Sequence, residues 1–427
     1  MTGIERPRGT LDWLPPRVEL RQHVIDTAIE TFERAGFRQI ITPVFEDTAL
    51  FARTAGETSD VVSKEMYSFH DRSDRPLTLR PEGTAPVVRA YLEHGLSREP
   101  QPVRLWYVAP MYRYAAPQAG RYREHYQFGV EAIGSEDPAV DAEVIALQAA
   151  WYRALGLGEL ELHLNSIGDP ACRPAYRAAL VAYFQPLRDQ LSTDSQERLE
   201  KNPMRILDSK DERDQPFIPA APRITQYLCE ACRAHLEAVR THLSARGVEH
   251  VLDDTLVRGL DYYTRTAWEW IPVADGRAQA TISGGGRYDG LAEQIGGKPA
   301  PGVGFGCGIE RLVLALEKEG REPPERGCDW FCATDVPEAR PKIGALLDEA
   351  RANGLEAEMD LAGRSLKGQL RHARRLGARV VSVIGPDEWS RGVARLRDDA
   401  VPLQDDVPLE LLVPAVADAL MTDTDRR

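Results

Sequence analysis

The chain contains little cysteine, with six Cys among 427 residues. That is too few for a disulfide scaffold and is typical of a protein kept in a reducing compartment. No apolar run approaches the ~18 residues that a membrane-spanning helix requires. Residues 1–16 also lack the apolar stretch of a secretory signal peptide. We therefore expect a cytoplasmic protein with no membrane association.

Basic residues are in deficit as well. The 53 Lys and Arg are outnumbered by 66 Asp and Glu, which leaves a formal net charge of −13. This balance excludes a protein that coats nucleic acid over its whole surface, but a local basic patch remains compatible with it. At 43% hydrophobic and 28% charged residues the composition is that of an ordinary globular protein, and the length predicts two or three domains.

The order of the predicted elements changes along the chain. Apolar residues at helical spacing predict a helix over 18–35, and the strand expected over 38–45 must place Pro43 at an edge or a break. Residues 170–250 are mostly helical, and beyond a linker at 320–327 strands alternate with helices. We predict a larger unit made of 1–169 and 251–320, a helical insertion at 170–250, and a small α/β domain with mainly parallel strands at 328–427.

A long hairpin carries the most informative polar pattern. With a period of two, one face of its second strand carries Arg123, His125, Gln127, Gly129 and Glu131, and the other face is apolar. Alternation alone also fits a solvated sheet face. Two arginines lie near this face, because Arg113 ends the first strand and Arg121 follows the connecting loop. Their presence favours a functional face over a merely solvated one.

A second polar stretch, Arg80-Pro81-Glu82-Gly83-Thr84, precedes a helix predicted over 85–94. Thr84 is the expected N-cap, and Glu82 lies beside the helix N-terminus. This carboxylate could serve the helix dipole alone, or it could anchor a substrate ammonium or imidazole.

Arg258 lies inside the apolar stretch Leu256–Tyr263 and needs an anionic partner, either Asp261 or a phosphate. The three consecutive glycines of the stretch 283–290 predict close backbone approach or a plain turn. The alternating glycines of 302–308 leave one strand face bare, as a flat ligand lying on it would require. Arg311 falls in the first turn of a helix predicted over 309–319, where its guanidinium could stack on a base. The second stretch is not a dinucleotide fingerprint, because the strand–turn–helix unit with a following acidic residue is missing.

Together these stretches resemble the class II aminoacyl-tRNA synthetases, and specifically the histidyl-tRNA synthetase family, over essentially the whole chain. The first helix with Thr42-Pro43-Val44 resembles motif 1, the dimerisation motif, while 104–134 and 302–316 resemble motifs 2 and 3. Leu256–Tyr263 and Ser283–Leu291 resemble the two histidine-specific motifs. The resemblance implies an α/β multidomain protein: an antiparallel-sheet catalytic core with a helical insertion, a C-terminal anticodon-binding domain, and a homodimer.

The resemblance also implies a reaction. ATP would activate L-histidine to histidyl-adenylate, and the histidyl group would pass to the 3′ end of tRNA(His), with Mg²⁺ neutralising the pyrophosphate. Arg113 and Arg258 would be catalytic and flank the α-phosphate, Arg121 would hold the γ-phosphate, and Arg311 would stack on adenine. The expected histidine-binding residues are Glu82, Gly83, Thr84, Gln127, Glu131, Tyr262 and Tyr263.

One residue departs from the family pattern. The glutamate usually found two positions after the motif 2 arginine is replaced by Ala115. Because that glutamate is associated with the nucleotide and the tRNA acceptor end, its loss puts adenine recognition and transfer in question.

A basic segment near the C-terminus points to tRNA independently. Six basic residues and no acidic residue lie between Leu361 and Arg379. On a helix predicted over 365–376, Lys367, Arg371 and Arg374 share one face, opposite an apolar stripe. A solvated helix face would look alike, but a local basic face on an acidic protein is typical of an RNA contact.

Two alternatives remain to be weighed. Cys229, Cys232 and His235 suggest zinc, but a structural zinc site needs a second ligand pair and none is near in sequence, so we expect packing residues and no metal. The alternative function is a catalytically silent regulatory subunit of ATP phosphoribosyltransferase. Such relatives typically lack the anticodon-binding domain and the motif that carries Arg258, so the enzyme is favoured.

Overall fold

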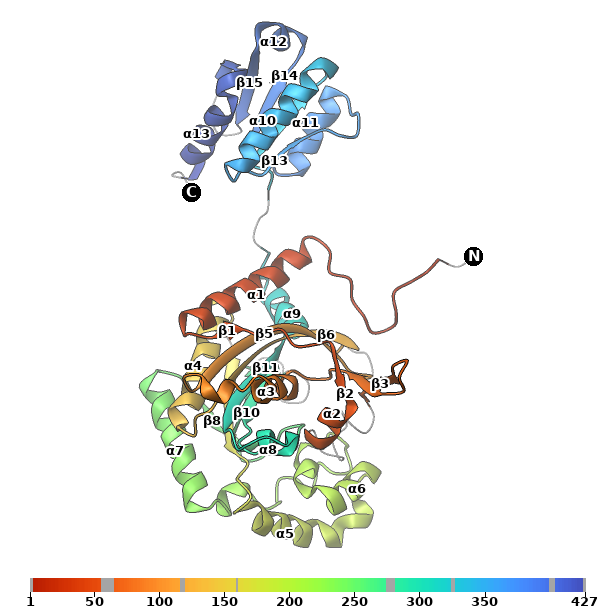
Figure 1. The fold of residues 1–427 in the computed structure, drawn as a ribbon, viewed down its shortest axis with the longest axis vertical. Helices are drawn as coiled ribbons and strands as arrows, with labels where there is room; N and C mark the ends of the chain where they lie inside the picture. The colour runs from red at the N-terminus through yellow and green to blue at the C-terminus, as the bar shows by residue number, and fades with distance from the viewer. Residues whose placement is uncertain are drawn as a thin grey trace. The chain divides into compact units, whose positions relative to one another are not determined.

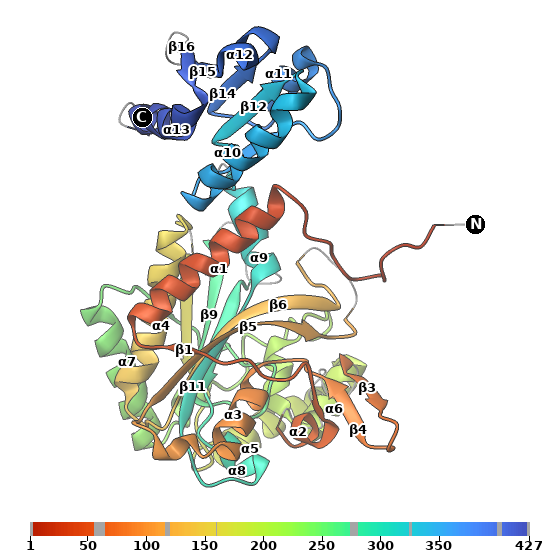
Figure 2. The ribbon, with the colours of Figure 1, turned by 45° about the horizontal axis from the view of Figure 1, so that its top comes forward.

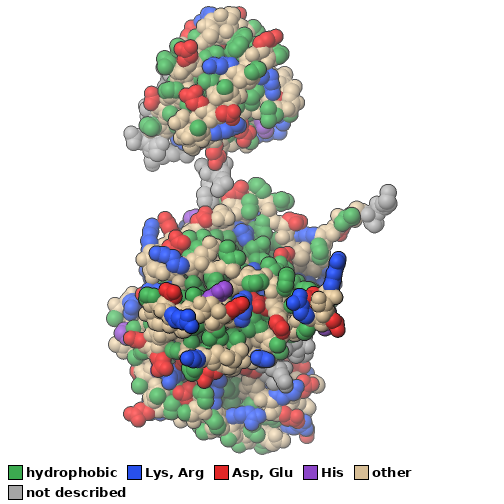
Figure 3. All heavy atoms as spheres, in the orientation of Figure 1, with side chains coloured by type: hydrophobic (Ala, Val, Ile, Leu, Met, Phe, Trp, Pro, Cys, Tyr) green, Lys and Arg blue, Asp and Glu red, His purple; other side chains and the backbone are tan. Residues whose placement is uncertain are grey.

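The computed structural model describes residues 3–54, 65–115, 120–158, 160–273, 281–323, 327–398 and 404–424. The chain forms two compact units, Met1–Pro323 and Pro324–Arg427, and their boundary falls within the predicted linker (Figure 1). None of the described helices is long and apolar enough to cross a membrane. Figure 3 shows acidic and basic side chains interspersed over the face in view.

An eight-stranded sheet organises the first unit, with strand order β1-β5-β6-β11-β10-β9-β7-β8. The strands are β1 (Arg38–Gln39), β5 (Val103–Tyr112), β6 (Glu124–Ile133), β7 (Leu160–Ser166), β8 (Val251–Leu252), β9 (Thr264–Pro272), β10 (Ser283–Arg287) and β11 (Gly302–Gly308). All neighbours from β5 to β7 pair antiparallel, and only the outer pairs β1–β5 and β7–β8 are parallel within the described sheet. The antiparallel core implied by the resemblance is therefore confirmed.

Helices cover both faces of this sheet. On one face α1 (Arg17–Arg34), α4 (Pro138–Ala154) and α9 (Ile309–Lys318) pack together (Figure 2). Their core includes Phe32, whose ring lies 5.4 Å from that of Phe128 and 5.7 Å from that of Phe305. The other face is covered by α2 (Thr48–Thr54), α3 (Thr84–Glu93), α8 (Leu291–Ile295) and a three-stranded sheet of β2 (Phe45–Asp47), β3 (Tyr67–His70) and β4 (Pro76–Leu79).

Two local predictions can be compared with these elements. The strand expected over 38–45 is interrupted, because β1 ends at Gln39 and β2 begins at Phe45, so Pro43 lies in a break as expected. The N-cap prediction for Thr84 is wrong. Gly83 occupies the N-cap position, and the Glu82 carboxylate accepts hydrogen bonds from the backbone N–H groups of Thr84 and Ala85 instead.

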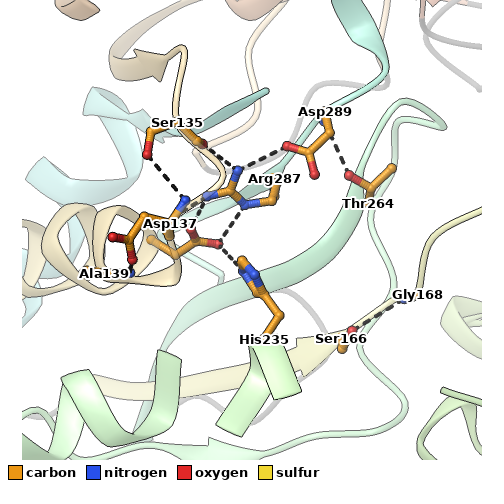
Figure 4. Close-up of polar contacts among 10 residues, drawn as sticks. Ser135, Asp137, Ala139, Ser166, Gly168, His235, Thr264, Arg287 and Asp289 are labelled. Carbon is orange, nitrogen blue, oxygen red and sulfur yellow. Dashed lines mark hydrogen bonds and ion pairs between the residues drawn. The ribbon is translucent and has the colours of Figure 1, made fainter. Parts of the chain in front are cut away.

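The segment between β7 and β8 is helical, as predicted, with α5 (Arg173–Phe184), α6 (Thr193–Lys201) and α7 (Glu230–Ala245) joined by short 3₁₀ turns. A buried ion-pair network ties α7 to the core (Figure 4). Asp141 of α4 contacts both His235, at 3.2 Å, and the fully buried Arg287 of β10, which also pairs with Asp289 at 3.0 Å. The boundaries 170–250 stay a prediction.

The second unit has a five-stranded sheet in the order β13-β12-β14-β15-β16. The strands are β12 (Trp330–Thr334), β13 (Ala357–Met359), β14 (Val380–Ile384), β15 (Val393–Asp398) and β16 (Gln404–Pro408), and the helices are α10 (Arg340–Ala352), α11 (Leu366–Arg375), α12 (Pro386–Arg391) and α13 (Leu412–Thr424). The first three strands of that order are parallel, as predicted. The antiparallel pair β15 and β16 was not predicted, because no hydrophobic run marks it.

Candidate active site

A cavity of about 310 Å³ lies over the central strands of the large sheet. Arg113 follows β5, Arg121 precedes β6, Arg258 precedes β9, and Arg311 stands in the first turn of α9. These four arginines come from separate stretches of the sequence, and all of them line this one cavity together with Gln127. The structure thus brings together the residues expected to bind ATP.

Three of these arginines are fixed by backbone or carboxylate oxygens. The Nε of Arg113 donates to the carbonyl of Pro81 at 2.7 Å, and Arg311 donates to the carbonyl of Thr281 at 2.6 Å. Arg121 pairs with Glu65 at 2.8 Å. Burial lowers the pKa of Arg113 and of Arg311, and the charges of neighbouring arginines lower both further. Such mutual repulsion is relieved by a polyanionic ligand.

The partner of Arg258 is Glu269 of β9, not the Asp261 considered from the sequence. Burial acts to lower the pKa of Arg258, but the Glu269 carboxylate, Tyr263 and Tyr262 together outweigh burial and raise that pKa. Gly284 makes room for this guanidinium, because a Cβ at that position would lie 2.2 Å from Arg258 Nη1. The second of the two motifs thought to be histidine-specific therefore shapes the surroundings of the first.

The histidine and the two glutamates that line the cavity, namely His125, Glu269 and Glu310, were not among the residues predicted for the site. Burial, with Arg113 and Arg311 nearby, lowers the pKa of His125 to about 3 and keeps its imidazole neutral. Burial raises the pKa of Glu310 to about 7, and its carboxylate accepts a bond from the Tyr126 N–H at 2.9 Å. The polar period of the second hairpin strand marked His125, but nothing in the sequence singled out the two glutamates.

A buried carboxylate pair lies beside the cavity. Glu131 of β6 is fully buried and accepts hydrogen bonds from Thr84 at 2.8 Å, Tyr288 at 2.5 Å and Tyr107 at 3.4 Å. Burial raises its pKa to about 8. Burial raises the pKa of Glu82 too, and the Tyr262 hydroxyl lies 3.4 Å from its carboxylate. The polar face of the hairpin is therefore enclosed in protein at Glu131, whereas His125 and Gln127 on the same face line the cavity.

Glycines create the space for this cluster. A Cβ at Gly83 or Gly129 would lie 2.3 or 2.2 Å from the ring of Tyr107, and one at Gly304 would lie 1.9 Å from a carboxylate oxygen of Glu131. Close approach of backbone is thus confirmed, but at these positions the approaching groups are the protein's own side chains.

The cluster and the cavity are neighbours. Arg113 is bonded to Pro81, next to Glu82, and the Arg258 guanidinium lies 5.5 Å from the ring centroid of Tyr263. Of the residues expected to bind histidine, Gln127 lines the cavity itself, and the other six lie in the adjoining buried cluster: Glu82, Gly83, Thr84, Glu131, Tyr262 and Tyr263. Ala115 is buried and lines the cavity, and residues 116–119 lie outside the described part of the chain.

The basic helix of the second unit is α11, which has Ser365 as N-cap and Leu376 as C-cap, as predicted. Lys367, Arg371 and Arg374 are exposed on it. Its apolar stripe of Leu366, Leu370 and Ala373 packs against the sheet. The two-faced pattern inferred from the sequence is confirmed.

An antiparallel sheet that presents convergent arginines beside a hydrogen-bonding pocket has the architecture of a class II aminoacyl-tRNA synthetase. A family model described as histidyl-tRNA synthetase matches residues 9–312, and one described as anticodon binding domain matches residues 333–418. The chain belongs to the histidyl-tRNA synthetase family.

Individual relatives agree over nearly the full length. A histidine–tRNA ligase of Moorella thermoacetica is 51% identical over 409 residues, which cover 96% of this chain and 96% of the relative. A histidine–tRNA ligase of Bacillus cytotoxicus is 48% identical over 422 residues, covering 98% and 100%. The crystal structure of apo S. aureus histidyl-tRNA synthetase is similar with a TM-score of 0.81 at 41% identity, covering 97% of this chain and 100% of that chain.

Proposed function

We propose that the chain is a histidine–tRNA ligase that activates L-histidine with ATP and transfers the histidyl group to the 3′ end of tRNA(His). The observation that carries this proposal is the convergence of four arginines on one cavity beside a buried pair of glutamates. The cavity suits a polyphosphate. The buried pair suits a small ligand that carries an ammonium group and an imidazole.

Histidine recognition falls to the buried cluster and Gln127. Glu82, Glu131 and the tyrosine hydroxyls offer acceptors and donors that an apolar amino acid could not satisfy. Sites built to hydrogen-bond their substrate reject analogues that lack the polar groups by about 10⁴-fold or more. Gly83 and Thr84 lie at the start of α3. The Tyr262 hydroxyl lies 3.4 Å from the Glu82 carboxylate, and the Tyr262 ring contacts that of Tyr263.

Phosphate handling falls to the arginines. The histidine carboxylate attacks the α-phosphorus of ATP and the bond to the β-phosphate breaks, so that pyrophosphate leaves. That step needs positioning and charge stabilisation more than covalent help. In this proposal Arg113 and Arg258 would flank this phosphate, Arg121 would hold the γ-phosphate, and Arg311 would stack on adenine. Ala115 removes a glutamate that the family usually offers here, so other groups must fix the base.

The reaction also implies Mg²⁺, which usually binds one or two protein carboxylates together with substrate phosphates. The residues present fit this requirement, because Glu269 and Glu310 line the cavity. Both carboxylates already have protein partners: Glu269 accepts from Arg258 and Thr281, and Glu310 accepts from the Tyr126 N–H. When bound, the ion neutralises charge on the pyrophosphate.

The partners follow from the reaction. The exposed face of α11 would contact tRNA(His), and an enzyme that uses free ATP and tRNA and keeps its thiols reduced would be expected in the cytoplasm. A homodimer is supported by apolar side chains exposed in the motif 1 region, where Ile41 is 85% exposed and Phe45 is 50% exposed. Sedimentation equilibrium of the full chain tests this dimer, and a mass that stays monomeric at micromolar concentration would contradict it.

The alternative of a silent regulatory subunit is weaker. A structure from Bacillus halodurans described as an ATP phosphoribosyltransferase regulatory subunit/histidyl-tRNA synthetase is 27% identical, with a TM-score of 0.64. This chain, however, keeps both Arg258 and an anticodon-binding unit. Neither is expected of a regulatory paralogue.

Amino-acid-dependent ATP–pyrophosphate exchange tests the proposal. We expect exchange with histidine alone among the twenty amino acids. Arg258→Ala should lower it by about 10²–10³-fold, because a charge-stabilising donor is lost. Arg246→Ala, at the exposed end of α7, is the matched control and should exchange normally. Silence with every amino acid would overturn the enzyme and favour the regulatory alternative.

A further inference from the structure

Four potential metal ligands meet where the helical insertion leaves the core. They are Asp169, Cys172, Cys229 and Cys232, and their ligand atoms all lie within 4.8 Å of one another. Asp169 follows β7, Cys172 is the N-cap of α5, and Cys229 is the N-cap of α7. The cluster is outside the catalytic cavity and has no part in the reaction proposed above.

The fold supplies the second ligand pair that the sequence seemed to lack. Asp169 and Cys172 form one pair with two intervening residues, and Cys229 and Cys232 form another with the same spacing. Two such pairs, separated by a long stretch of chain, are the usual plan of structural zinc sites. His235, considered with these cysteines from the sequence, points elsewhere and is bonded to Asp141.

Three of the six distances between ligand atoms lie close to those of a tetrahedral zinc site. With Zn–S bonds of about 2.3 Å and a Zn–O bond of about 2.0 Å, the edges of a tetrahedral site are about 3.8 Å for S···S and about 3.5 Å for S···O. The Sγ atoms of Cys172 and Cys232 are 3.8 Å apart, and Asp169 Oδ1 lies 3.5 Å from Cys172 Sγ and 3.8 Å from Cys229 Sγ.

The surroundings hold these ligands in place. Gly168 has a positive φ of 67°, and a Cβ there would lie 2.7 Å from Cys172 Sγ, so glycine is required for this loop to fold around the sulfur. Arg265 lies 3.7 Å from the outer carboxylate oxygen of Asp169. The N-termini of two helices, α5 and α7, meet at the cluster, with Cys172 and Cys229 at their N-cap positions.

We propose that Asp169, Cys172, Cys229 and Cys232 bind one structural zinc ion. The ion joins the end of β7 to the first turns of α5 and α7 and so fixes the insertion to the catalytic core. It also braces the active site indirectly. Arg173, the residue after a ligand, donates to the backbone carbonyls of Ile167, at 3.0 Å, and of Tyr263 in the predicted histidine site.

The test is metal analysis of the full chain, purified under reducing conditions without chelator. Elemental analysis by inductively coupled plasma mass spectrometry should find about one zinc ion per chain. Cys172→Ser and Cys232→Ser should lower this to less than about a tenth, while Cys332→Ala, which removes a buried thiol of the second unit, should leave it unchanged. Zinc that persists in both serine variants would overturn the assignment.

A cobalt titration of the unsubstituted protein keeps the proposal testable if the serine variants fail to fold. Co²⁺ should give the sulfur-to-metal charge-transfer band and the visible bands of a tetrahedral thiolate site, and Asp169→Cys should intensify the charge-transfer band by adding a fourth thiolate. Zinc should displace the colour. Failure to bind either metal, or a Cys172–Cys232 disulfide found in the purified protein, would overturn the proposal.

Discussion

Glu131 lies on a strand face that its polar pattern could have left in solvent, but the structure buries it completely. It is fully buried under Thr84, Tyr107 and Tyr288, and burial raises its pKa from 4.5 to about 8. The folded protein therefore keeps a proton that the unfolded chain releases between these two values. Because the folded state binds this proton more tightly than the unfolded state does, protonation of Glu131 contributes to the free energy of unfolding. The contribution is fully present below pH 4.5 and is lost as the pH rises through 8.

Replacing Glu131 by Gln should flatten the pH dependence of stability. In the unsubstituted protein the group contributes a slope of up to about 1.4 kcal/mol per pH unit, and the variant, which cannot titrate, lacks it. Urea unfolding at several pH values between 5 and 8 measures the difference. Glu310→Gln is the control, because the pKa of Glu310 reaches only about 7 and its effect should end at lower pH. Identical slopes in the unsubstituted protein and Glu131→Gln would contradict the burial argument.

Residue types near one another in sequence were predictable, and long-range pairings were not. Period-two alternation placed Gln127 and Glu131 on one face of a strand, as the structure confirms. The pairing of Arg258 with Glu269 depends on how β9 folds back on the preceding loop. Likewise, Asp169 and Cys229 stand 60 residues apart and meet only through the packing of α5 and α7.

At the scale of elements, β11 contains a matched pair of glycines. A Cβ at Gly304 would lie 1.9 Å from Glu131 and 2.3 Å from the backbone carbonyl of Val130, whereas one at Gly306 would come no closer than 3.4 Å to Gln127. Backbone cannot move aside as a flexible side chain can. Gly304→Ala should therefore lower the free energy of unfolding by about 1–3 kcal/mol, the usual cost of overpacking.

Gly306→Ala should cost less than about 1 kcal/mol, because the added methyl faces the cavity at ordinary contact distance. It should instead raise the KM for ATP in the exchange assay, since Gly306 lines the cavity. Urea unfolding of both variants makes the comparison. If both variants lost the same free energy of unfolding, the cost of a Cβ in β11 would not depend on its position, and the prediction would be wrong.

Helix boundaries were predicted correctly where the hydrophobic periodicity agreed with residues that typically begin or end a helix. Gly36 and the apolar repeat fixed the end of α1 to within a residue or two, and Ser365 marked the start of α11. The prediction was wrong at α3, where either of two side chains could satisfy the free N–H groups at the helix N-terminus. Thr84 has the residue type of an N-cap, but its hydroxyl bonds Glu131 while the Glu82 carboxylate satisfies the free N–H groups of α3.

At the scale of the whole molecule, an acidic net charge is compatible with the proposed RNA contact because the basic residues are concentrated in one segment. The chain carries −13 overall, yet the segment from Leu361 to Arg379 has six basic residues and no acidic one. Lys367, Arg371 and Arg374 are exposed on α11, within the residues matched to an anticodon binding domain. The tRNA contact and the chemistry proposed above therefore fall on different units and should be separable by mutation.

The triple variant Lys367→Ala, Arg371→Ala, Arg374→Ala should separate them. Histidine-dependent exchange should be unchanged, because the catalytic cavity lies wholly in the first unit. Aminoacylation should show a KM for tRNA raised about tenfold or more, and the salt dependence of tRNA binding should weaken by about two units of log–log slope, at about 0.7 per phosphate contact. Lys342→Ala, which removes an exposed charge from α10, is the control and should change neither. An unaltered KM and salt slope in the triple variant would move the tRNA contact to another face of this unit, while a loss of exchange would mean that the units are energetically coupled.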